Sequence, residues 1–80
     1  MEVSAKRRKN EKEFGNWEET SSGRSYWFEI QGRSGGKARY VKEVDLSETT
    51  ISFWQEIFNA EGKMVEIHQK FPNDRGHLKL

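Results

Sequence analysis

The chain has 80 residues and no cysteine, so neither a disulfide framework nor a thiolate metal site can stabilise it. Its longest apolar run, residues 26–28, is far shorter than the roughly 20 residues that cross a bilayer. The basic residues near the start are not followed by the apolar segment of a secretory signal. We therefore expect a cytoplasmic protein that makes no membrane contact.

Neither charge sign dominates, because 14 lysines and arginines face 13 aspartates and glutamates. The net charge of +1 argues against a protein whose whole surface binds nucleic acid. A chain of this length buries only about 60% of the surface of its unfolded state, so we expect modest stability that a partner subunit would increase. The two histidines lack the short spacing of recognisable zinc sites, and we expect no metal and no cofactor.

Residues 1–16 form a polar block that differs from the rest of the chain. The basic run from Lys6 to Lys9 is followed by acidic residues, and the few apolar residues do not make a continuous helical stripe. This composition predicts a flexible or weakly helical charged arm, either solvated or in contact with phosphate. We assign residues 17–80 to a single small β-rich domain.

The domain contains several segments rich in strand-forming residues, separated by glycine-containing turns. Residues 25–31 and 39–44 are the clearest strands, and residues 16–20 can add a short edge strand. With the hairpin described below, this pattern predicts a mainly β fold. We expect an antiparallel meander of four strands, possibly five.

Residues 48–61 are compatible with two structures. Apolar residues at 51, 53, 54, 57 and 58 occupy one arc of a helix, which Ser47 could cap and Gly62 could end. Against a helix stand Thr49, Thr50 and the aromatic residues that follow, because such side chains lose rotamer freedom there. We favour a strand. The alternative is an α+β domain in which residues 48–61 form a helix on a three-stranded sheet.

The turn chemistry of residues 59–63 predicts a β-hairpin in which Gly62 takes a positive φ. Pairing of Asn59 with Lys63 sets the register. The polar face then has three cross-strand pairs: Phe58 with Met64, Glu56 with Glu66, and Trp54 with His68. The other face is nearly all apolar and carries Ile51, Phe53, Ile57, Val65, Ile67 and Phe71.

Two carboxylates opposite each other need a bridging cation, which Arg39 or Lys42 could supply. A carboxylate beside an imidazole and a cation is also the set required for metal-independent cleavage of a phosphodiester. In that hypothesis Glu66 is the base, His68 the acid, and Lys70 or Arg39 stabilises the developing charge. The alternative is a solvated charge ladder with His68 stacked on Trp54, and a shift of one residue would separate the set.

A sheet face with tryptophans beside arginine and lysine also suits RNA or single-stranded DNA, although both tryptophans could instead be packing residues. We favour a non-enzymatic function as a binding module. The alternatives are a structural or homodimeric protein-interaction domain and a small, toxin-like ribonuclease. The predicted binding residues are Trp27, Arg39, Trp54, Glu56, Glu66, His68, Lys70 and His77.

Overall fold

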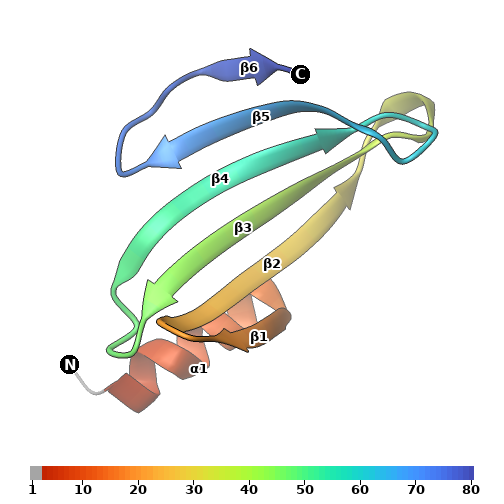
Figure 1. The fold of residues 1–80 in the computed structure, drawn as a ribbon. Coiled ribbons are helices and arrows are strands. Elements are labelled where there is room, and N and C mark those ends of the chain that lie inside the picture. The colour runs from red at the N-terminus through yellow and green to blue at the C-terminus, as the bar shows by residue number, and fades with distance from the viewer. Residues whose placement is uncertain (1–2) are drawn as a thin grey trace.

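The computed structural model describes residues 3–80 as one antiparallel sheet of six strands with a helix packed against it (Figure 1). Neighbouring strands follow chain order from β1 to β6, so the sheet is a simple meander. The elements are α1 (Val3–Phe14), β1 (Asn16–Thr20), β2 (Gly23–Gln31), the 3-10 turn η1 (Arg33–Gly35), β3 (Lys37–Asp45), β4 (Thr50–Phe58), β5 (Met64–Phe71) and β6 (His77–Lys79).

The predicted mainly β class is confirmed, with six strands in place of four or five. The alternative helix over residues 48–61 is wrong, because β4 pairs with β3 on one side and β5 on the other. Its β-branched and aromatic residues fit a pleated strand better than a helix. The sixth strand was not predicted, since β6 has only three residues. Within the segment predicted as a flexible or weakly helical arm, residues 3–14 form α1 and Asn16 begins β1, while residues 1–2 lie outside the described residues.

Strand alternation gives the sheet two different faces. The face that we call the helix face carries Tyr26 and Phe28 of β2, and α1 packs on it near β1 and β2 (Figure 1). The ring of Phe14, the last residue of α1, lies 5.9 Å from that of Tyr26, 5.4 Å from Phe28 and 6.4 Å from Phe53. The other face, which we call the open face, carries Trp27 and Trp54.

A buried polar network joins α1 to the loop between β3 and β4. Glu48 is 5% exposed, and its carboxylate accepts hydrogen bonds from the Tyr26 hydroxyl at 2.5 Å and from Asn10 Nδ2 at 3.2 Å. Burial and the bond to Glu48 raise the pKa of Tyr26 to about 12, so its hydroxyl stays protonated and donates at neutral pH. Asn10 in turn accepts a bond from Lys42 Nζ at 2.9 Å. Since α1 has no continuous apolar stripe, these polar contacts attach the helix to the sheet and to the β3–β4 loop.

Arg24 makes a second set of contacts between α1 and the sheet. Its guanidinium lies 2.7 Å from Glu11 and 2.6 Å from Glu19, and 5.5 Å from the Trp17 ring. Burial alone would lower the pKa of Arg24, but the bonds to Glu11 and Glu19 outweigh that effect and keep the pKa above its ordinary value. Arg24 therefore stays charged and is part of the packing of α1.

The apolar core is small for a sheet of this size. Among the described residues the buried apolar side chains are Tyr26, Val41 and Val44, whereas Ile30, Leu46, Leu78 and others are more than one third exposed. No helix in this part of the chain has the length and apolar character needed to span a bilayer. Much of the sheet is therefore a single layer with accessible faces.

Candidate functional site on the helix face

A bulge in the β4–β5 hairpin determines which residues share a face. Asn59 and Lys63 flank the turn as predicted, Gly62 has φ +82°, and Phe58 pairs with Met64. Beyond that pair the register shifts by one, because Val65 is an extra residue on β5 and Ile57 faces Glu66.

The predicted pairs of Glu56 with Glu66 and Trp54 with His68 are therefore wrong. Glu56 faces Ile67, and His68 faces Gln55. The shift turns Glu66 and His68 toward the helix face, while Trp54 and Glu56 stay on the open face. The predicted binding residues consequently divide into two groups on opposite faces of the sheet.

The first group forms a surface on the open face that we call the tryptophan surface: Trp27, Arg39, Val41, Trp54 and Glu56. Val41 lies between the two tryptophans in one cross-strand row. The indole nitrogen of Trp54 donates a hydrogen bond to Glu56 Oε2 at 2.8 Å. This contact holds Trp54 in place and uses its polar atom.

Carboxylates compensate the cations near the tryptophan surface. Arg39 lies 2.8 Å from Glu29 and 3.7 Å from Glu56, and Lys37 lies 3.3 Å from Glu29. The hydrogen bonds from Arg39 and Lys37 hold the pKa of Glu29 below its ordinary value, so its negative charge persists at neutral pH. Strand alternation adds the carboxylates of Glu18 and Glu43 to this face. The open face is thus a poor surface for phosphate.

The second group forms a cluster on the helix face that we call the histidine cluster: Glu66, His68, Asp74 and His77. His68 Nε2 lies 2.6 Å from Asp74 Oδ1, His77 Nδ1 lies 3.0 Å from Glu66 Oε1, and the two imidazole centroids are 4.4 Å apart. The hydrogen bond from the Gly76 amide and the contact with His68 hold the pKa of Asp74 below its ordinary value. Each imidazole is thus matched with one carboxylate.

The two histidines differ in what they can offer a ligand. Asp74 occupies Nε2 of His68, and Nδ1 of His68 is buried without a partner, so neither ring nitrogen is available to a ligand. The side chain of His77 is 49% exposed, and its Nδ1 side faces Glu66. Its Nε2 makes no hydrogen bond within the described residues. His77 is therefore the accessible imidazole, and its Nδ1 lies against the Glu66 carboxylate.

An aromatic platform adjoins this cluster. One cross-strand row runs from Phe28 through Tyr40, Gln55 and His68 to His77. The Tyr40 ring stacks on Phe28, with centroids 5.0 Å apart and planes 14° apart. Gln55 Nε2 donates a hydrogen bond to the Tyr40 hydroxyl at 3.0 Å. We call Phe28, Tyr40 and Phe53 the aromatic platform.

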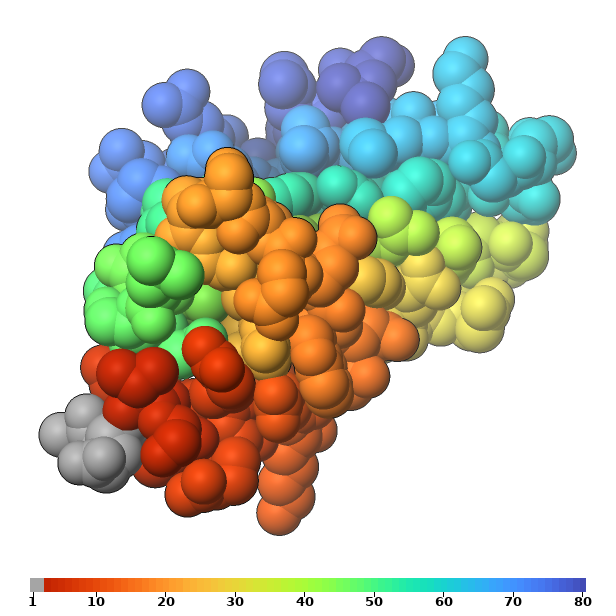
Figure 2. Space-filling view, turned by 60° about the horizontal axis from the view of Figure 1, so that its bottom comes forward, coloured from red at the N-terminus to blue at the C-terminus, as the bar shows by residue number. Residues whose placement is uncertain are grey.

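A cation lies over this platform, because Lys70 Nζ is 5.7 Å from the centre of the Tyr40 ring. Phe53 continues the platform on the other side of Tyr40, with centroids 6.3 Å apart. The space-filling view shows α1 at one end of the molecule beside the β3–β4 loop (Figure 2), and its contacts with the sheet are mainly to β1 and β2. Lys70 and the histidine cluster therefore lie on the part of the helix face that α1 does not cover.

The candidate residues from the sequence did not include Tyr40, Phe53 or Phe71. The available signal was strand alternation, since Tyr40 and Lys42 share the face of Tyr26 once β2 and β3 are paired. The face of the sheet on which each side chain of β5 lies was not predictable without knowledge of the bulge. Within residues 3–80, no group of three or more histidine, cysteine, aspartate or glutamate side chains has the geometry to hold a metal ion.

No protein-family model matches the chain, and comparisons with curated proteins and with solved structures give no significant match.

Proposed function

We propose that this domain binds single-stranded nucleic acid, RNA or DNA, on the part of the helix face that α1 leaves open. The observation that carries the proposal is the aromatic platform with Lys70 above the Tyr40 ring. Aromatic rings stack with any base, and a neighbouring lysine attracts the phosphate backbone, which together give binding without sequence preference.

Charge favours the helix face over the open face. Arg39, the arginine of the tryptophan surface, is compensated by Glu29 and Glu56. Lys70 has no carboxylate within ion-pair distance among the described residues. The helix face also carries the carboxylates of Glu66 and Asp74, each of which lies against a histidine. The helix adds further positive charge beside this face, from Lys6, Arg7, Arg8, Lys9 and Lys12, against Glu11 and Glu13. A phosphate backbone would therefore be drawn to this side of the sheet.

The matched pair Lys70→Gln and Arg39→Gln tests this proposal. Each variant removes one positive charge from a half-buried strand position. Lys70→Gln is expected to weaken binding of a short single-stranded RNA several-fold at low salt. It should also reduce the slope of log K against log salt by about 0.7, the value for one lost phosphate contact on a single strand. Fluorescence anisotropy over a salt series measures both quantities.

Arg39→Gln is expected to leave the affinity for this RNA and its salt slope unchanged, because Arg39 lies on the open face and is paired with Glu29 and Glu56. Equal losses in both variants would mean that general charge, and not the helix face, determines binding. A larger loss in Arg39→Gln would move the binding surface to the open face.

A second candidate function, metal-independent cleavage of RNA, is favoured by the pairing of His77 with Glu66. With Nδ1 directed to the carboxylate, Nε2 is free to remove the proton of a ribose 2′-hydroxyl. The 2′-oxygen then attacks the adjacent phosphorus, and the bond to the 5′-oxygen breaks as that oxygen takes a proton from solvent water. The His77 imidazolium returns its proton to the solvent. The products are a 2′,3′-cyclic phosphate and a free 5′-hydroxyl. A nearby lysine, Lys70 or Lys79, would stabilise the negative charge of the transition state.

A further inference from the structure

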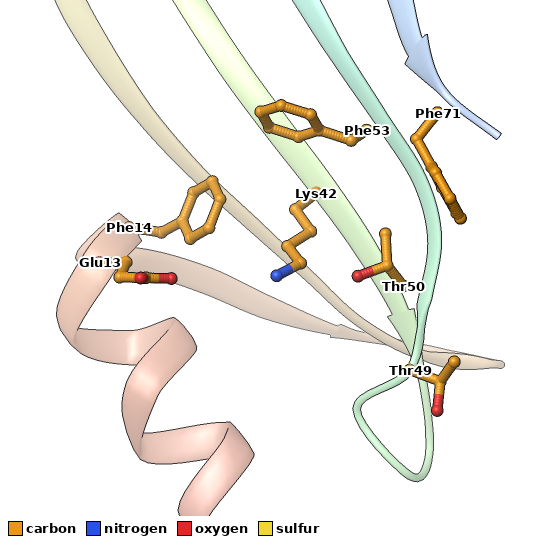
Figure 3. Close-up of a pocket in the computed structure, with 7 residues that line it drawn as sticks. All are labelled: Glu13, Phe14, Lys42, Thr49, Thr50, Phe53 and Phe71. Carbon is orange, nitrogen blue, oxygen red and sulfur yellow. The ribbon is translucent and has the colours of Figure 1, made fainter. Parts of the chain in front are cut away.

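An apolar groove lies on the helix face between the end of α1 and strands β3 to β5. Its volume is about 470 Å³, within the range of small-molecule sites. Figure 3 shows the rings of Phe14, Phe53 and Phe71 around the side chain of Lys42, whose ammonium group points toward α1. Thr50 at the start of β4 and Thr49 just before it also line the groove.

Lys42 gives this groove a cationic end. Its Nζ forms no ion pair with a carboxylate within the described residues. It donates a hydrogen bond to Asn10 Oδ1 at 2.9 Å and lies 5.8 Å from the centre of the Phe14 ring. A neighbouring hollow of about 180 Å³ shares Lys42 and Glu13 with the groove and is also lined by Lys6 and Lys9. Three lysines thus line the two adjoining hollows.

The acidic groups at this point are fewer than the lysines and offset their charge only in part. Glu48, which lines the smaller hollow, is occupied by Tyr26 and Asn10 and lies 3.5 Å from Arg7. Glu13 is exposed and makes no ion pair within the described residues, so it is the one carboxylate there that is free to oppose the three lysines. The groove therefore has an aromatic part and a cationic part, which suits an anion with a planar apolar body.

Phe53 connects the groove to the aromatic platform, since its ring lines the groove and also stacks with Tyr40. A strand lying over Tyr40 would bring its next base to the groove. We propose that the groove is a subsite for one nucleotide of the bound strand. Its base packs against Phe53 and Phe71, and its phosphate binds Lys42 with Lys6 and Lys9. This inference rests on the proposed nucleic-acid function and deepens it by naming a base-binding pocket.

An NMR titration of the labelled protein with adenosine 5′-monophosphate, uridine 5′-monophosphate and inorganic phosphate tests the subsite. Both nucleotides are expected to shift the ring resonances of Phe53 and Phe71, whereas inorganic phosphate should shift only the side chain of Lys42 and its neighbours. Phe71→Leu should weaken nucleotide binding about tenfold, in line with the loss of one stacked base. Phe71 is 45% exposed, so this variant should retain its fold.

Phe58→Leu is the matched control. It makes the same change in a ring of the open face, where Phe58 lies beneath Lys37 and Arg39, and it should leave nucleotide binding unchanged. Equal ring shifts with phosphate alone would overturn the base-binding part of the inference. If single-stranded RNA shifts the platform but neither nucleotide shifts the groove, the subsite is wrong and the proposed function stands. If RNA and nucleotides both leave the spectrum unchanged, both proposals fail.

Discussion

Glu48→Ala is expected to lower the free energy of unfolding by about 3 kcal/mol, because it leaves the Tyr26 hydroxyl and Asn10 amide buried without their acceptor. Each such donor costs roughly 1–3 kcal/mol. The loss should be large relative to the total stability of so small a domain. Urea denaturation followed by tryptophan fluorescence measures it, and an exposed turn variant, Glu61→Ala, should change stability by less than about 0.5 kcal/mol.

The backbone at Glu48 allows a sharper comparison. Its φ of 64° lies in the left-handed region, where a side chain costs about 1–2 kcal/mol that glycine avoids. Glu48→Gly should therefore lose less stability than Glu48→Ala by about that amount, although both remove the carboxylate. Equal stability of Glu48→Ala and wild type would show that the network does not anchor α1.

His77→Ala is expected to reduce cleavage of a short single-stranded RNA by about 10²-fold or more, the usual contribution of a general base. Cleavage is followed by appearance of the 2′,3′-cyclic phosphate product in the presence of a metal chelator. Affinity for a non-cleavable 2′-deoxy strand should change little, because binding rests on the platform and lysines. The variant should also fold, since the side chain of His77 is half exposed.

His68→Ala is the matched control for His77→Ala. Its ring nitrogens are occupied by Asp74 or buried, so cleavage should fall less than tenfold. A greater loss in His68→Ala than in His77→Ala, with the fold intact, would return the catalytic role to His68. An RNA that stays intact with the wild-type protein would remove the cleavage hypothesis and leave the binding proposal in place.

The strands were predictable because their side-chain chemistry is local. Tyr26 to Ile30 and the residues of β4 carry β-branched and aromatic side chains, and glycine-containing turns separate the strands. The same local rules predicted that Asn59 and Gly62 form the hairpin turn. β6 escaped prediction because it is a three-residue strand whose pairing depends on where the preceding loop returns the chain.

The faces of β5 were not predictable, because a bulge adds one residue without a sequence signal of its own. Val65 suits either a regular strand position or a bulge, yet its insertion moves Glu66 and His68 to the opposite face. The packing of α1 on the sheet could not be predicted from the sequence for a different reason. It depends on buried polar contacts such as Asn10 with Glu48, which hydrophobic periodicity does not detect.

The hypothesis of a homodimer or other protein interaction stays a prediction. The tryptophan surface and exposed apolar residues such as Leu78 would be the groups available to a partner on the open face. Its excess of carboxylates opposes the pairing of two identical copies face to face, since like charges would meet.

The most direct test of a nucleic-acid site on the helix face is a two-dimensional NMR titration of the wild-type protein. Short single-stranded RNA and DNA would be added at low and at physiological salt. The account predicts shifts at Tyr40, Phe53, Lys70 and His77 that weaken as salt rises, with Trp27 and Trp54 unchanged. Shifts confined to the two tryptophans, or no shift at either salt concentration, would contradict it.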